Sequence, residues 1–174
     1  MSNTLKKPFS EFFDQYFRDE LGDLPKNTGR VYFLENMDSK NHQKVIDIAN
    51  KLEIYHSVDV MVDTTITGNK KEGLFIGSSG NITIKPFLEE PIFKNVDDAS
   101  IRYYEDDNEI RIGSEYVKLI HQESRLFAKR FTQCVKAYKN QDEPAPAPKV
   151  TIDTSKSDLD DMDARMRELE AGLK

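Results

Sequence analysis

Two aspartates and a histidine lie close enough in the sequence to form an acid–base site: Asp59 and Asp63 are four residues apart, and His56 precedes them. Two neighbouring carboxylates can separate their pKa values and act as an acid and a base. The same spacing is typical of a strand with one solvated face, because the aspartates alternate with valines over residues 58–63. Burial preferences favour solvent exposure for both aspartates. We therefore expect no catalytic residues, and a small hydrolase-like enzyme is the last of three functional alternatives.

The residues that could hold a metal have no suitable spacing. His42, His56 and His121 lie at unrelated positions, without a His-x-x-x-His pair or a cysteine cluster. The single cysteine, Cys134, falls in a helical pattern of apolar residues, which is typical of a small buried side chain rather than a reactive thiol. We expect neither a metal nor a cofactor.

Lysines, hydroxyls and glycines are concentrated in residues 64–73, a composition that could bind an anion. Lys70 and Lys71 lie in this segment, and Lys85 follows the next two predicted strands; these three are the candidate anion-binding residues. The segment lacks the Gly-x-x-x-x-Gly-Lys-Ser/Thr spacing whose amides surround a phosphate. A β-turn with solvated lysines is the favoured interpretation, and binding of a phosphate or an anionic lipid headgroup is the alternative.

Charge and hydropathy narrow the classes of partner. Among 174 residues, 25 Lys and Arg face 31 Asp and Glu, so the formal net charge is −6. Such a charge repels a polyphosphate backbone, and we expect no nucleic acid partner. No apolar run approaches the roughly 20 residues of a membrane helix, and no signal-peptide core follows the first lysines. The sequence therefore indicates a cytoplasmic protein, with binding to a membrane surface not favoured.

The elements that position these residues form an α+β pattern. Short β-type runs separated by turn signals occupy residues 58–112, and a long amphipathic helix is predicted over 115–140. A β-prone run at 31–34 and a helix presenting apolar residues over 39–52 precede them. Before these, a helix over 10–21, capped by Ser10, carries an aromatic stripe that we expect to pack on the protein's own core rather than on a membrane. The order predicts a small antiparallel β-roll or partial barrel closed by the last helix.

The composition changes abruptly after residue 140. A Pro/Ala-rich run predicts a linker over 141–155. In 156–174, five apolar residues step by three and four positions, the spacing of a coiled-coil seam: Leu159, Met162, Met166, Leu169 and Leu173. About two heptads are too few for reliable helix formation alone, so a flexible, disordered tail and a partner-binding helix both stay open. The predicted organisation is an N-terminal extension (1–38), a domain (39–140), the linker and this tail.

Three stretches of the chain resemble uncharacterised bacterial pleckstrin-homology-like (PH-like) domains. Residues 62–76 have an Asp-Thr strand end, a Gly-Lys turn and a Gly-hydrophobic-hydrophobic run; residues 82–85 and 89–93 and the following hairpin and long helix continue the likeness, which covers about 39–140. The resemblance implies a curved sheet capped by a C-terminal helix and a non-enzymatic role in binding protein or lipid. We therefore expect an intracellular adaptor or assembly module whose terminal apolar residues dock on another protein or on a second copy.

Overall fold

The computed structural model describes residues 5–19 and 30–142, which belong to one structural unit. This unit is an α+β fold, as the sequence predicted. The elements in chain order are α1 (Phe9–Asp14), a π-helical turn (Gln15–Asp19), β1 (Val31–Phe33), a 3-10 turn (Leu34–Asn36), α2 (Ser39–Lys51), β2 (Val60–Asp63), β3 (Gly73–Ile76), β4 (Asn81–Lys85), β5 (Ile92–Asn95), β6 (Ile101–Tyr104), β7 (Glu109–Ile112), β8 (Glu115–Lys118), α3 (Gln122–Lys139) and a 3-10 turn (Asn140–Asp142).

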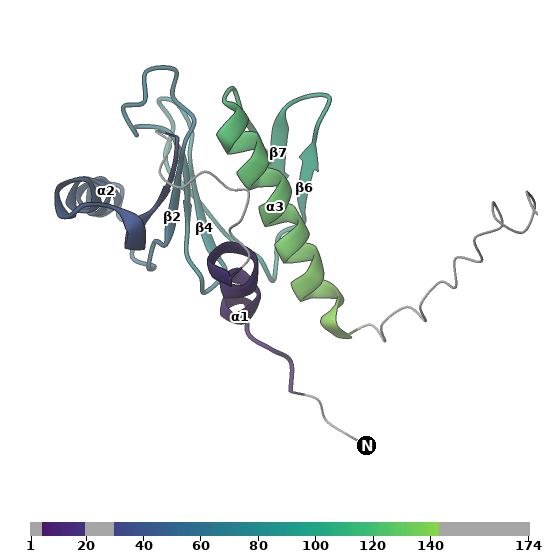
Figure 1. Cartoon of the computed structure of the whole chain (residues 1–174). Helices are drawn as coiled ribbons and strands as arrows, with labels where there is room; N and C mark the ends of the chain where they lie inside the picture. The colour runs from purple at the N-terminus through teal and green to yellow at the C-terminus, as the bar shows by residue number, and fades with distance from the viewer. Residues whose placement is uncertain (1–4, 20–29, 143–174) are drawn as a thin grey trace, which may run out of the picture. The chain divides into compact units, whose positions relative to one another are not determined.

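The strands form two antiparallel sheets in which neighbours in sequence are neighbours in space. One sheet has the order β1-β2-β3-β4-β5 and the other the order β6-β7-β8. Figure 1 shows α2 on the outer side of the five-stranded sheet, and α1 and α3 on its other side. Most of these connections are short turns, which is why the turn signals of the sequence located them, whereas β1 and β2 are joined through α2.

The central strands of the five-stranded sheet, β2, β3 and β4, are buried on both faces. Val60 and Val62 point into the main core, and Met61 points into a second cluster with Val45 and Ala49 of α2. α2 therefore covers one face of the sheet, and Asp38 caps it by accepting a hydrogen bond from the Asn41 amide. The expectation that the Met61 side of β2 is solvated was wrong, because α2 occupies that face.

The aromatic stripe of α1 packs into the main core. Phe9, Phe13 and Phe17 are buried, and the ring of Phe17 stacks on that of Phe127 in α3 with 5.1 Å between centroids. The predicted docking on the protein's own core is thus confirmed. The helix differs from the prediction in its ends: Pro8 rather than Ser10 is the N-cap, and regular α-helix stops at Asp14 before the π-helical turn.

The predicted helix over 115–140 began too early. Its first residues, Glu115–Lys118, form β8, and α3 starts at Gln122. The reason is the turn at Gly113, which has φ of 63° and returns the chain antiparallel to β7. β8 then packs the half-buried Val117 side chain against the main core, a tertiary contact that helical periodicity cannot reveal.

Two further observations bear on the predictions. No helix within residues 5–19 and 30–142 is long and apolar enough to cross a membrane. The predicted linker beyond Asp142 and the terminal apolar residues, Leu159, Met162, Met166, Leu169 and Leu173, lie outside the described residues.

Candidate functional site

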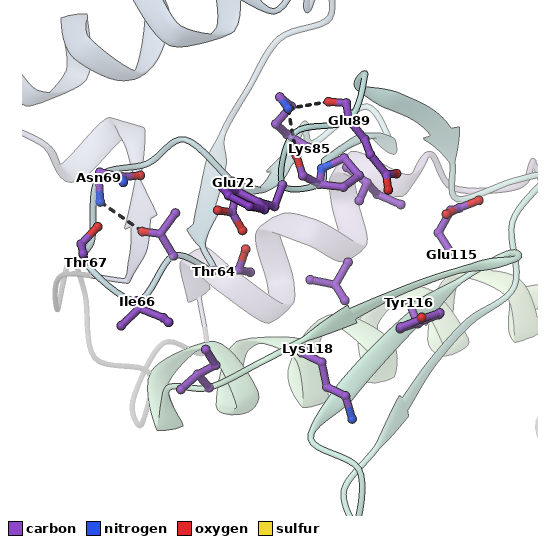
Figure 2. A pocket seen from close by; sticks show the side chains of 17 residues that line it. Thr64, Ile66, Thr67, Asn69, Glu72, Lys85, Glu89, Glu115, Tyr116 and Lys118 are labelled. Carbon is purple, nitrogen blue, oxygen red and sulfur yellow. Dashed lines mark hydrogen bonds between the residues drawn. The ribbon is translucent and has the colours of Figure 1, made fainter.

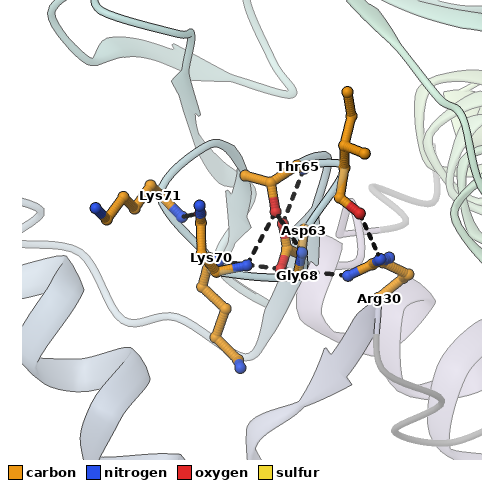
Figure 3. Close-up of polar contacts among 8 residues, drawn as sticks. Arg30, Asp63, Thr65, Gly68, Lys70 and Lys71 are labelled. Carbon is orange, nitrogen blue, oxygen red and sulfur yellow. Dashed lines mark hydrogen bonds and ion pairs between the residues drawn. The ribbon is translucent and has the colours of Figure 1, made fainter.

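Asp63 organises the loop between β2 and β3 (Figure 3). Its side chain is fully buried and accepts three hydrogen bonds, from the Thr65 amide (2.9 Å), the Thr65 hydroxyl (2.5 Å) and the Lys70 amide (3.0 Å). An Arg30 guanidinium nitrogen lies 4.0 Å from the second carboxylate oxygen. The predicted exposure of Asp63 was therefore wrong: the loop folds back over the carboxylate, which has a structural role.

A second layer of bonds fixes the rest of this loop. The Thr65 hydroxyl oxygen accepts from the amides of Gly68 (3.0 Å) and Asn69 (3.1 Å). Arg30 donates to the carbonyl of Ile66 (3.0 Å). Gly68 has φ of 75°, and a β-carbon there would collide with the Arg30 guanidinium. These contacts hold Ile66 outward on a loop whose own backbone is well bonded.

The structure does not bring the three candidate anion-binding lysines together. The Lys70 ammonium lies 4.6 Å from the ring centroid of Tyr32, and the Lys71 side chain is exposed and points in a different direction (Figure 3). The Lys85 ammonium donates to two carbonyls of the loop that follows β4 (Figure 2). The amides of Lys70 and Lys71 are also bonded within their loop, so they do not form a phosphate cradle.

The side chains considered for acid–base catalysis also have separate partners. Asp59 accepts from the Ser78 amide (2.6 Å) and lies 3.3 Å from an Arg18 guanidinium nitrogen. The two ring nitrogens of His56 lie 2.8 Å from the Ser57 carbonyl oxygen and the Thr83 hydroxyl oxygen. Since Asp63 is enclosed by its own loop, these three side chains share no site.

An open groove of about 790 Å³ lies between the β2–β3 loop, the end of β4 with its following loop, and β8 (Figure 2). Four exposed large apolar side chains line it: Ile66, Phe87, Tyr116 and Ile120 are 77, 65, 68 and 52 % exposed. The described residues contain nine such exposed side chains, so nearly half of them gather at one groove. A clustered apolar surface of this kind is typical of an interaction site.

The charges that line the groove favour a cationic ligand. Glu72, Glu89 and Glu115 contribute carboxylates, and none of them forms an ion pair with a described residue. Lys85 and Lys118 also line the groove, but the Lys85 ammonium is directed to loop carbonyls. The groove therefore has more free negative than free positive charge.

Lys118 is likewise directed away from the groove. Its ammonium donates to the Asp107 carbonyl (3.1 Å) and lies 3.5 Å from a carboxylate oxygen of Glu109. A hydrogen bond from Arg111 is the main cause that lowers the pKa of Glu109, which keeps this carboxylate ionised. The Lys118 ammonium is thus bound by β7 and the β6–β7 hairpin.

The remaining reactive groups do not suggest chemistry. Cys134 is buried as predicted, and burial raises its pKa to about 12, so the thiol is protonated near neutral pH. Within residues 5–19 and 30–142, no group of three or more His, Cys, Asp or Glu side chains could hold a metal ion.

The groove itself was missed from the sequence. Ile66 is a single apolar residue in a polar loop, and Phe87 forms a short apolar pair with Leu88 before two glutamates; such residues were a usable signal of an exposed contact. Tyr116 and Ile120 carried no signal, because both fell within the helix predicted over 115–140. Three distant segments of the chain form the groove, which no local pattern shows.

We compared the chain with known families, curated proteins and solved structures. No family model, no curated protein and no solved structure matches it.

Proposed function

We propose that this chain is a non-enzymatic intracellular adaptor or assembly module that binds another protein through the groove between the β2–β3 loop and β8. The observation that carries the proposal is the gathering of Ile66, Phe87, Tyr116 and Ile120, all exposed, around one groove. Burying these side chains against a partner releases water from apolar surface, the main favourable term in most protein association. The order of two antiparallel meanders and a final helix supports, in addition, the proposal of a PH-like body.

Charge supports a protein partner over an anionic headgroup. A headgroup site needs convergent cations, whereas Lys70, Lys71 and Lys85 have separate surroundings. The carboxylates of the groove would repel a phosphate. An acid–base enzyme has still less support, since the candidate carboxylates and imidazole do not meet.

The terminal segment stays a second, separate prediction. If Leu159, Met162, Met166, Leu169 and Leu173 form a docking helix, replacing Met162 and Met166 by Asp removes two apolar contacts without touching the folded unit. Partner capture would then fall while the melting temperature stays unchanged; capture unaltered by the double variant would reject this role of the tail.

The groove is tested with two neighbouring substitutions. Phe87 lines the groove and Leu88 does not, although the Leu88 side chain is 86 % exposed. We expect Phe87→Asp to abolish capture of the partner from cells that make the protein, and Leu88→Asp to leave it intact, in quantitative mass spectrometry of the purified full-length chain.

A membrane control separates the alternatives. Flotation with vesicles of anionic and neutral lipids should show no salt-sensitive binding. Binding that is lost on Lys70→Glu with Lys71→Glu, together with equal protein capture by Phe87→Asp and Leu88→Asp, would replace the adaptor proposal by headgroup binding.

A further inference from the structure

We propose that the groove binds its partner as an extended strand that pairs with the free edge of β8, and that this strand carries alternating apolar and basic side chains. This inference rests on the proposed function and specifies how the protein partner is bound. Strand addition supplies affinity through main-chain hydrogen bonds, and the side chains of alternate residues supply specificity.

The hydrogen-bonding direction of β8 follows from its register. Val117 lies opposite Ile110. Two residues further on, Leu119 donates a hydrogen bond from its amide to the Asn108 carbonyl (2.8 Å), so Val117 and Leu119 both have backbone groups that face β7. In an antiparallel pair, residues that bond to the partner strand alternate with residues whose amide and carbonyl point the other way. The backbone groups of Tyr116 and Lys118 are therefore directed away from β7.

These outward groups have no partner in the part of the chain that the structure describes. β8 is the last strand of its sheet, and no described residue forms a hydrogen bond with the amide or carbonyl of Tyr116 or Lys118. Unpaired edge groups are a template for another strand. A lysine often guards such an edge, but the Lys118 ammonium is held on the β7 side by Glu109 and the Asp107 carbonyl.

The groove runs along this edge rather than across one face of the sheet. All four consecutive residues of β8, 115–118, line it, although successive side chains of a strand point to opposite faces. A groove that follows the backbone edge accounts for this lining, because backbone atoms of every residue face it. The β2–β3 loop, with Ile66 (Figure 2), and the loop after β4 form the opposite wall, and Phe87 of the second loop also lines the groove.

The side chains of the walls define the chemistry of the added strand. Ile66, Phe87 and Ile120 offer apolar contacts, and Glu72, Glu89 and Glu115 offer carboxylates that form no ion pair with a described residue. A strand with apolar residues on one face and Lys or Arg on the other satisfies both sets. A second copy of this chain fits less well, because its formal net charge of −6 would meet the same acidic groove.

The test starts with selection of short random peptides displayed on phage against the full-length chain. We expect enrichment of sequences that alternate apolar and basic residues, with binding lost on Phe87→Asp and retained on Leu88→Asp. Each backbone amide of an enriched peptide is then N-methylated in turn, and binding is measured by fluorescence anisotropy. Strand pairing predicts about tenfold or greater weakening at every second position and little change between them, since only alternate amides face β8.

Two substitutions test the same edge from the protein's side. Tyr116→Pro removes the amide that faces the groove and leaves the ladder to β7 intact, and edge strands tolerate proline at such positions. Tyr116→Ala is the matched control, because it removes the same side chain but keeps the amide. We expect Tyr116→Pro to bind the selected peptide about tenfold more weakly than Tyr116→Ala, with both melting as cooperative folded proteins.

Each outcome decides between the proposals. Peptides that depend on Phe87 but show no two-residue period in the methylation scan would overturn strand addition and leave the proposed function standing. Enrichment of acidic peptides would overturn the assigned chemistry. No enrichment, or binding indifferent to Phe87→Asp, would overturn both. A dimer in sedimentation that Tyr116→Pro dissociates would assign the edge to a second copy instead.

Discussion

Removing the Asp63 carboxylate should strongly destabilise the folded unit. In Asp63→Ala, the amide and hydroxyl of Thr65 and the amide of Lys70 lose their acceptor. A buried donor left unpaired costs about 1–3 kcal/mol. Thr65 is buried, so both of its donors bear this cost, whereas Lys70 is only half-buried and water can reach its amide. Arg30 also loses a partner. We expect a loss of about 3–5 kcal/mol.

Asp63→Asn gives a graded comparison at constant size. The amide oxygen can replace the oxygen that accepts both bonds from Thr65, but the amide nitrogen then faces the Lys70 donor. One mismatched donor predicts a loss of about 1–3 kcal/mol. Asp106→Ala, at the exposed β6–β7 hairpin, should change stability by less than about 0.5 kcal/mol.

Urea unfolding followed by far-UV circular dichroism measures these differences, since the chain contains no tryptophan. The expected order of stability is wild type and Asp106→Ala, then Asp63→Asn, then Asp63→Ala. An Asp63→Ala protein that unfolds within about 1 kcal/mol of wild type, with an unchanged dependence on urea, would refute the view that this carboxylate organises the loop.

Two further predictions concern buried groups of α3. Because burial raises the pKa of Cys134 from 9.0 to about 12, the folded thiol holds its proton at pH values where the unfolded thiol ionises. The stabilisation that the protonated thiol gives is complete below about pH 9 and is lost as the pH rises toward 12. The free energy of unfolding of Cys134→Ala should therefore fall less over this pH range than that of the wild type. An equal fall in both proteins would contradict the prediction. The buried Ser124 hydroxyl has no hydrogen-bond partner among the residues that the structure describes, so Ser124→Ala should stabilise the protein by about 1 kcal/mol in urea unfolding. Thr132→Ala, which removes a hydroxyl bonded to the Ala128 carbonyl, should not stabilise it. A destabilised Ser124→Ala protein would show that the hydroxyl is satisfied.

Local sequence patterns located most of the strands. Gly80 with its flanking polar residues marks the turn into β4, and the short β-type runs predicted over 58–112 contain β2 to β7. These elements pair with sequence neighbours, so the signals that define them are all within a few residues. The same locality explains the error at β8, where Leu119 and Ile120 extended a helical period backwards across the junction with α3.

The burial of Asp63 and the existence of the groove depend on contacts between distant segments. An aspartate at a strand end is equally compatible with a solvated face and with a loop that closes over it, and only the positions of Thr65, Lys70 and Arg30 decide. The alternation in β2 also could not tell that α2 would cover the second face. For Asp63, tertiary packing overrides the average preference of a polar residue for solvent.

The candidate lysines show why the number of charged residues near a loop does not give the net charge that a ligand meets at a binding site. What a ligand meets is the charge left after the protein's own contacts are made. The Lys70 ammonium is placed over an aromatic ring, and those of Lys85 and Lys118 are bonded to carbonyls. The groove carboxylates Glu72 and Glu89 have no cationic partner among the described residues. The groove is therefore acidic, although lysines lie close to it in the sequence. Because the unpaired charges of the groove are negative, we expect the partner of β8 to be a basic, strand-forming segment.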